Sequence, residues 1–269
     1  LDYVGVKTFD GAGQVTGERR FIGLWTSSAY SHSPGDIPVL RHKVQRVIAQ
    51  FGQLPSSHDS KAVAHVIETF PRDELFQASV ADLARMVRGI VNLYERAQVR
   101  LFVRRDVFGR FQSCLIYVPR DRYNTQVRER IERLALEAFG GQAVESQVQL
   151  SESALARVHL LFRTPPGTVQ LQDAAELERR IRETVRTWQD HLRDRLQQDR
   201  DETAARRLMH DWGQAFPAAY QEDTPPAAAL TDIATLAALA ADPDGLHMHL
   251  YRAEGQPAHR VQFKLYRQD

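Results

Sequence analysis

The chain has 269 residues, of which 43% are hydrophobic and 26% are charged, and its formal net charge is +1. This composition is typical of a globular protein with a buried core, and the small net charge gives no reason to expect nucleic acid or a membrane as partner. The single cysteine excludes an intrachain disulfide, and no run approaches the ~18 apolar residues of a transmembrane helix. We therefore expect a cytoplasmic protein.

The first segment is predicted to form a β-hairpin. Residues 3–9 and 20–25 are rich in β-branched and aromatic side chains, and the stretch GAGQVTG at 11–17 separates them. A dinucleotide-binding loop would need the spacing G-x-G-x-x-G and a helix after it. The spacing here is G-x-G-x-x-x-G and a strand follows, so we interpret the glycines as a hairpin turn.

Apolar residues recur at helical spacing through residues 36–97. The expected helices cover about 38–51 and 59–70, and a third begins at Ser79. Ser79 is followed three residues later by Asp82, which is typical of a capping box. The adjacent carboxylates Asp73 and Glu74 are interpreted as surface charge between two helices.

From residue 99 the apolar period changes from 3.6 to 2, which indicates strands. The expected strands and helices cover 99–105, 111–119, 124–140, 142–150, 157–164 and 172–199. Gly109 can supply the positive φ of the first hairpin turn, and Asn124 or Thr125 can cap the first helix. The order ββαββα is the content of a ferredoxin-like α+β sandwich.

The remaining segments are predicted to be helical and then to end in a hairpin. The expected helices cover about 202–213, 216–222 and 227–240, and the strands cover 246–252 and 259–266. Two strands alone are marginally stable, so we expect this hairpin to open a further sheet domain. His247 and His249 share one strand face, but a catalytic zinc usually needs three protein ligands. We interpret both as polar residues on an exposed face.

The strand at 99–105 carries the candidate site, because its apolar residues alternate with Arg100, Phe102 and Arg104. The apolar face should pack on helices. The face with arginine and phenylalanine has three interpretations: packing on another domain, binding a small anion through arginine forks, or stacking RNA bases. We favour domain packing, and the net charge of +1 counts against RNA.

Motifs of catalysis are missing from the sequence: there is no G-x-S-x-G, no H-E-x-x-H and no Walker loop. Cys114 lies within an apolar strand, which favours a buried and unreactive thiol. We therefore assign no catalytic, cofactor-binding or metal-binding residue to this chain.

Four stretches together resemble the large, multidomain NAD-specific glutamate dehydrogenases of bacteria. They are RRFIGLWTSSAYSHSPGDIPVLRHKV (19–44), SSHDSKAVAHVIETFPRDELFQ (56–77), VRLFVRRDVFGRFQSCLIYVPRDRYNT (99–125) and RVHLLFRTPPG (157–167). The resemblance covers essentially the whole chain.

The resemblance implies a domain order. Residues 1–35 would be the tail of a PAS-like sheet region, 36–97 a helical linker, 98–170 an ACT-like domain, 171–244 a helical motif and 245–269 the first hairpin of a further ACT-like domain. The usual ACT order is βαββαβ, whereas the order expected here is ββαββα. The domain is therefore either permuted or completed by an outside element.

The resemblance also implies a function. The family oxidises glutamate to 2-oxoglutarate with NAD, but its catalytic lysine and aspartate and its dinucleotide loop match nothing here. We therefore expect a non-catalytic regulatory and assembly region whose partner is the dehydrogenase domain of the same polypeptide. A homo-oligomer and an amino-acid effector are expected, and NAD belongs to the parent enzyme only. The alternative is an RNA- or anion-binding sheet module that uses Arg100, Phe102 and Arg104.

Overall fold

The computed structural model describes residues 2–52, 58–140, 142–150, 153–163, 173–242, 244–252 and 261–267. The chain forms two compact units, Leu1–Thr184 and Val185–Asp269, which are described separately. Both units combine helices with antiparallel strands, so the predicted α+β class is confirmed. None of the helices in the described ranges is long and apolar enough to cross a lipid bilayer.

The first unit begins with the predicted hairpin, formed by β1 (Asp2–Phe9) and β2 (Val15–Gly23). The Asp10 carboxylate accepts hydrogen bonds from the backbone N–H groups of Ala12 and Gln14, at 2.9 and 2.8 Å. Gly13 has a φ of 79°, a value that favours glycine. The glycine-rich stretch therefore forms a turn followed by a strand, as predicted, and provides no helix N-terminus for a pyrophosphate.

A helical layer follows the hairpin. Its helices are α1 (Ser27–Ser31), α2 (Leu40–Ala49), α3 (His58–Thr69), α4 (Arg72–Gln77) and α5 (Val80–Glu95). The cap predicted at Ser79 is confirmed, since its hydroxyl accepts the Asp82 N–H at 3.0 Å. The short helices α1 and α4 were not predicted, because five or six residues show no apolar period. We refer to α2–α5 as the helical motif.

The ACT-like domain has the predicted order ββαββα. Its elements are β3 (Arg100–Arg105), β4 (Phe111–Pro119), the 3-10 helix η1 (Arg120–Arg122), α6 (Thr125–Phe139), β5 (Gln142–Leu150), β6 (Leu155–Arg163) and α7 (Ala174–Thr184). The strands form one antiparallel sheet in the order β3-β4-β6-β5. Moving β3 to the end of the chain gives the usual order βαββαβ with the same neighbours. The domain is therefore a permuted ferredoxin-like sandwich.

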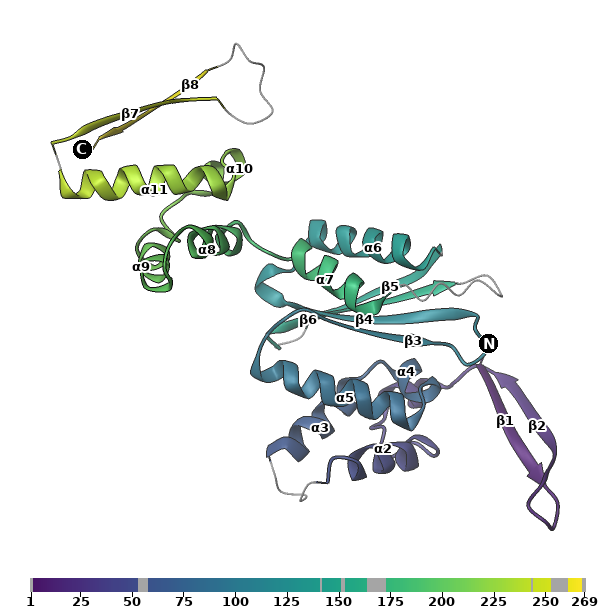
Figure 1. The fold of residues 1–269 in the computed structure, drawn as a ribbon. Coiled ribbons are helices and arrows are strands. Elements are labelled where there is room, and N and C mark those ends of the chain that lie inside the picture. The colour runs from purple at the N-terminus through teal and green to yellow at the C-terminus, as the bar shows by residue number, and fades with distance from the viewer. Residues whose placement is uncertain are drawn as a thin grey trace. The chain divides into compact units, whose positions relative to one another are not determined.

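Helices cover both faces of this sheet (Figure 1). Helices α6 and α7 cover one face, where the rings of Phe139 and Phe162 lie 5.4 Å apart. The helical motif covers the other face and shares one buried core with Phe102, Leu115 and Tyr117. The sequence had suggested helices on one face only. The second layer packs on Phe102, which lies on the face that carries Arg100 and Arg104 and for which packing on another domain was favoured.

The helix expected over 172–199 is interrupted, so that prediction is wrong. Helix α7 ends at Thr184, and α8 (Trp188–Asp199) begins after Thr187. Thr187 and Asp190 form a reciprocal capping box: the Thr187 hydroxyl accepts the Asp190 N–H, and the Asp190 carboxylate accepts the Thr187 N–H. Helix α7 contacts β3 and so belongs to the sandwich, although it follows the boundary expected at residue 170.

The second unit contains α8, α9 (Glu202–Trp212), α10 (Ala218–Asp223), α11 (Pro226–Ala241), β7 (Leu246–Tyr251) and β8 (Gln262–Arg267). In β7 the leucine face is exposed, with Leu246 and Leu250 at 59% and 69% exposure, whereas His247 and His249 are half-buried. The prediction of an exposed histidine face is therefore wrong. The polar face of the hairpin turns to α11, where the Asp232 carboxylate accepts the Tyr266 hydroxyl at 2.6 Å.

Candidate functional site

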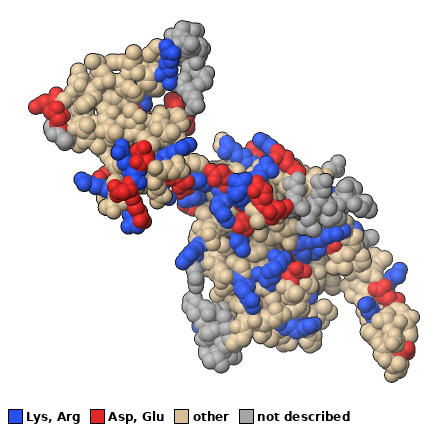
Figure 2. Space-filling model, in the orientation of Figure 1, with Lys and Arg blue, Asp and Glu red and all other residues tan. Residues whose placement is uncertain are grey.

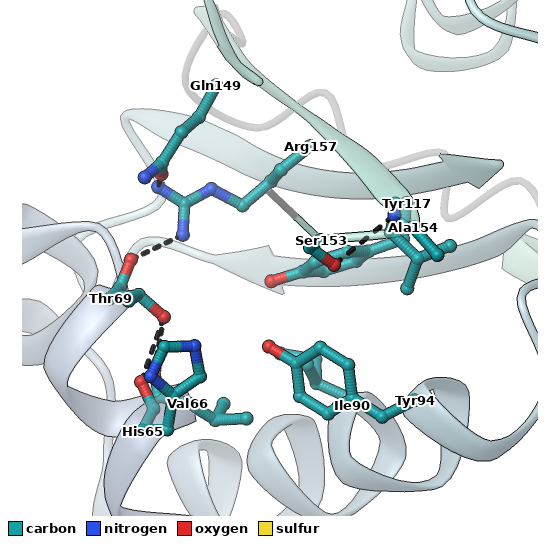
Figure 3. Close-up of a pocket in the computed structure, with 11 residues that line it drawn as sticks. His65, Val66, Thr69, Ile90, Tyr94, Tyr117, Gln149, Ser153, Ala154 and Arg157 are labelled. Carbon is teal, nitrogen blue, oxygen red and sulfur yellow. Dashed lines mark hydrogen bonds between the residues drawn. The ribbon is translucent and has the colours of Figure 1, made fainter. Parts of the chain in front are cut away.

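A cavity of about 560 Å³ lies in the first unit between the helical motif and the sheet (Figure 3). Val66, Ile90 and Leu155 form part of its apolar wall. Its polar lining residues are His65, Thr69, Tyr94, Ser153, Tyr117, Gln149 and Arg157, of which the last three come from the sheet. A volume of this size lies within the range of pockets that bind small molecules.

Strand register brings the sheet residues of this cavity together. Arg157 on β6 lies opposite Tyr117 on β4 and opposite Gln149 on β5. Because successive side chains of a strand point to opposite faces, Leu155, Arg157 and His159 share the face that the helical motif covers. The apolar residues between them, Ala156 and Val158, are fully buried on the other face.

Arg157 is the one arginine among the described residues that line this cavity. One guanidinium nitrogen, Nη1, donates to the Thr69 carbonyl oxygen at 2.6 Å, and the other, Nη2, donates to the Gln149 side-chain oxygen. Both partners are neutral, as is the Tyr117 side chain, which also interacts with Arg157, and no ion pair among the described residues includes Arg157. A guanidinium has five N–H donors. Arg157 therefore retains both charge and donors for an anionic group.

Two tyrosines face the cavity near Arg157 (Figure 3). Burial raises the pKa of Tyr117 to about 12, although the nearby Arg157 partly opposes that shift. Burial also raises the pKa of Tyr94, again against the influence of Arg157. Both hydroxyls are therefore neutral at pH 7, and each can donate and accept one hydrogen bond to a polar ligand.

A buried ion pair fixes the helical motif next to this cavity. Glu74 on α4 and Arg104 on β3 form two hydrogen bonds of 2.7 Å, and the Glu74 side chain is 1% exposed. Burial alone would raise the pKa of Glu74, but the two hydrogen bonds and the positive charge of Arg104 outweigh it and lower the pKa to about 2. The interpretation of Glu74 as surface charge is therefore wrong.

His159 extends this network into the sheet. Its Nε2 lies 2.9 Å from the Ser113 hydroxyl and 3.8 Å from a Glu74 carboxylate oxygen. Ser113 and His159 are both buried. The polar side chains that β4 and β6 place on this face thus meet Glu74 rather than solvent.

The three residues predicted as a site, Arg100, Phe102 and Arg104, do not form one exposed site. Arg100 is half-exposed and pairs with Glu178 on α7 at 3.3 Å. The side chains of Phe102 and Arg104 are buried against the helical motif. This face was expected to pack on another domain, to bind an anion or to stack bases. Phe102 and Arg104 pack on the helical motif, which lies in the same unit. Stacking a base on Phe102 would require the helical motif to move away.

The residues of the cavity and of the adjacent Glu74 network were not predicted from the sequence. Arg157 and His159 alternate with apolar residues within RVHLLFR, and this pattern was a signal for a polar row on one strand face. Glu74 lies in a six-residue helix and offered no comparable signal.

Cys114 and His249, which were considered as a reactive thiol and a metal ligand, both pack against neighbouring side chains. Cys114 is fully buried, as expected, and burial raises the pKa of its thiol. His249 stacks on Tyr251 with ring centroids 5.5 Å apart. Within the part of the chain that the structure describes, no group of three or more His, Cys, Asp or Glu residues is placed to hold a metal ion.

Three family domains match the chain. Residues 37–96 match helical motif 1 of glutamate dehydrogenase, residues 100–189 match its ACT2 domain, and residues 195–239 match its helical motif 2. The second range includes α7, in agreement with the packing of that helix on the sheet.

Three relatives that match most or all of the chain have the same name. The chain is 36% identical to the NAD-specific glutamate dehydrogenase of Halomonas elongata over 98% of its length, and 37% identical to that of Pseudomonas aeruginosa over 100%. The chain belongs to the NAD-specific glutamate dehydrogenase family. The protein of the same name from Mycobacterium tuberculosis is 34% identical over 84% of the chain. The chain spans about 16% of the length of the first two relatives.

Proposed function

We propose that this chain is a non-catalytic regulatory and assembly region of an NAD-dependent glutamate dehydrogenase. The parent reaction would be the oxidative deamination of L-glutamate to 2-oxoglutarate. The ACT2 and helical-motif matches support this proposal, as does the absence from the sequence of a strand–GxGxxG–helix segment that could hold NAD. The dehydrogenase domain and the NAD site would then lie elsewhere in the same polypeptide, in a cytoplasmic homo-oligomer.

The region would act by binding an amino acid in the cavity between the helical motif and the sheet. The observation that carries this proposal is Arg157, a cation with neutral partners in a cavity of about 560 Å³. A guanidinium suits the carboxylate of an amino acid, the neutral hydroxyls of Tyr94 and Tyr117 can accept from its ammonium group, and the apolar wall can contact its side chain. A ligand there would touch both layers and so favour one arrangement of them.

A thermal-shift screen of the chain with the common amino acids tests the sensing proposal. A ligand that binds only the folded state raises stability by RT ln(1 + [L]/Kd). The variant His65→Trp places a larger ring in the cavity wall and should abolish the shift. Arg46→Gln, an exposed residue on α2, is the matched control and should retain it. If no amino acid shifts the melting temperature, the region acts in assembly alone.

A second experiment tests the non-catalytic role. The purified chain, incubated with glutamate and NAD, should form no NADH above a protein-free blank. NADH formation at a rate proportional to chain concentration, and lost in heat-denatured protein, would contradict the proposal.

The RNA- or anion-binding alternative uses Arg100, Phe102 and Arg104. Burial of Phe102 and Arg104 speaks against it, and so does the mixed surface charge: Figure 2 shows acidic and basic side chains next to one another over α6 and α7. Salt-dependent binding of single-stranded RNA that is weakened by Phe102→Leu would revive it.

A further inference from the structure

A second cavity, of about 290 Å³, lies in the first unit beside the cavity described above. Tyr30, Arg72 and Asp73 line it from the helical side. The sheet contributes Gln147, Gln149, Arg157 and His159, of which Gln149 and Arg157 also line the first cavity. The function proposed above uses the first cavity, and the two cavities share Gln149 and Arg157.

Arg72 has an unusual environment in this second cavity. Its Nη2 donates only a long hydrogen bond, 3.4 Å, to the Tyr30 carbonyl oxygen. Its Nη1 is buried and, in the described ranges, is the one buried side-chain nitrogen or oxygen without a hydrogen-bond partner. Leaving a buried charged donor unsatisfied is costly. The Nη1 of Arg72 would therefore be stabilised by an acceptor, and the described residues supply none.

Arg104 in the same unit shows how a buried guanidinium group is satisfied by a carboxylate. Arg104, which lies two strands from Arg157 on the same sheet face, is held by both oxygens of Glu74. Neither Arg72 nor Arg157 has a carboxylate within ion-pair distance among the described residues, and both line the second cavity. Two cations without acidic partners thus converge on one small space.

The remaining charge at this cavity is Asp73, whose carboxylate accepts the Tyr30 hydroxyl at 3.0 Å. Two guanidinium groups and one carboxylate leave an excess of one positive charge. The histidine of the lining, His159, is engaged with the Ser113 hydroxyl at 2.9 Å. The balance of charge therefore suits one anionic group rather than a cation or a neutral ligand.

We propose that the second cavity binds the oxyanion group, carboxylate or phosphate, of a small ligand, with Arg72 as its principal donor. A guanidinium offers two parallel N–H donors that match two oxygens of either group. Arg157 adds positive charge from the sheet, and the side-chain amide of Gln147 adds a neutral donor. The volume lies at the lower end of the range for ligand pockets, so the ligand is small.

Calorimetric titration of the 269-residue chain tests this site, with sodium phosphate and sodium acetate as probes and sodium chloride at matched ionic strength as control. Saturable binding of either probe is expected, and the probe that binds more tightly identifies the oxyanion class. Arg72→Met keeps the apolar stem and removes the charge, and should weaken binding about tenfold or more. Arg72→Lys should bind with intermediate affinity.

Two controls separate this site from the first cavity and from a folding defect. Arg46→Gln and His65→Trp should bind the probe as the wild type does. This expectation does not depend on the result of the thermal-shift screen with amino acids. Unliganded Arg72→Met should melt at or above the wild-type temperature, because it removes an unsatisfied buried donor. Equal affinity of Arg72→Met and wild type, a response to both probes no greater than to chloride, or a lower melting temperature of Arg72→Met would each overturn the proposal.

Discussion

Arg104 and Glu74 form a bidentate ion pair that joins strand β3 to helix α4, with both N···O distances at 2.7 Å and both side chains almost fully buried. Gln77 on the same helix also accepts from Arg104, at 3.0 Å. The pair connects two segments that the sequence suggested were separate, a helical linker and an ACT-like domain. It makes the position of the helical motif depend on the sheet.

Breaking this pair from one side should be strongly destabilising. Glu74→Leu leaves a buried guanidinium without its carboxylate, and we expect a loss of about 3–5 kcal/mol. In the double variant Glu74→Leu/Arg104→Met both charges are gone, so the loss should be smaller than in the single variant. Native-state hydrogen exchange of the amides in β4 and β6 measures this unit separately from the second one. A double variant less stable than Glu74→Leu would contradict the assignment.

The same carboxylate should make the stability of the first unit depend on pH. The pKa of folded Glu74 is lowered to about 2, against an ordinary value of 4.5. Its contribution to the free energy of unfolding is therefore complete above about pH 4.5 and is lost as the pH falls from there towards 2. Urea unfolding of the wild type between pH 6 and about pH 3 should show this loss. Glu74→Gln, which cannot titrate, should show a shallower decline over the same window.

Gly89 on α5 should resist replacement by alanine. Alanine in a helix interior is normally more stable than glycine by about 1 kcal/mol. Here a Cβ would lie 2.5 Å from Cε1 and 2.7 Å from Cζ of the buried Phe102 ring. We expect Gly89→Ala to destabilise by about 1–3 kcal/mol, because the overlap exceeds the gain in propensity.

A rescue experiment assigns the Gly89 effect to the ring. Phe102→Leu shortens the side chain, so Gly89→Ala should cost less in that background than in the wild type. Gly23→Ala, where a Cβ meets nothing within 4 Å, is the control and should change stability by no more than about 0.5 kcal/mol. If Gly89→Ala stabilises the wild type, the ring does not pack as described.

Helix caps, which depend on residues close together in the sequence, could be predicted. Pairs of side chains far apart in the sequence could not. The caps at Ser79 and Asn124 were predicted because each acts on a backbone N–H three residues away. The alternation in β3 showed that Phe102 and Arg104 share a face, but not that α5 and Glu74 cover it. The bond from Arg104 to Glu74 spans 30 residues, and that from Arg157 to Thr69 spans 88. Neither pair is marked by a periodic pattern in the sequence, so the cavity between the helical motif and the sheet could not be predicted.

The break between α7 and α8 gives a last test, because a continuous helix was expected there. The Thr187 hydroxyl accepts the Asp190 N–H at 3.2 Å, and the Asp190 carboxylate accepts the Thr187 N–H at 3.0 Å. Thr187→Ala removes one half of this capping box and should cost about 1 kcal/mol. Hydrogen exchange of the first turn of α8 measures it, and Thr187→Ser should retain most of the cap. Thr231→Ala, an exposed replacement in α11, is the control and should change stability by less than about 0.5 kcal/mol. If α8 is as well protected in Thr187→Ala as in the wild type, packing rather than the cap starts this helix.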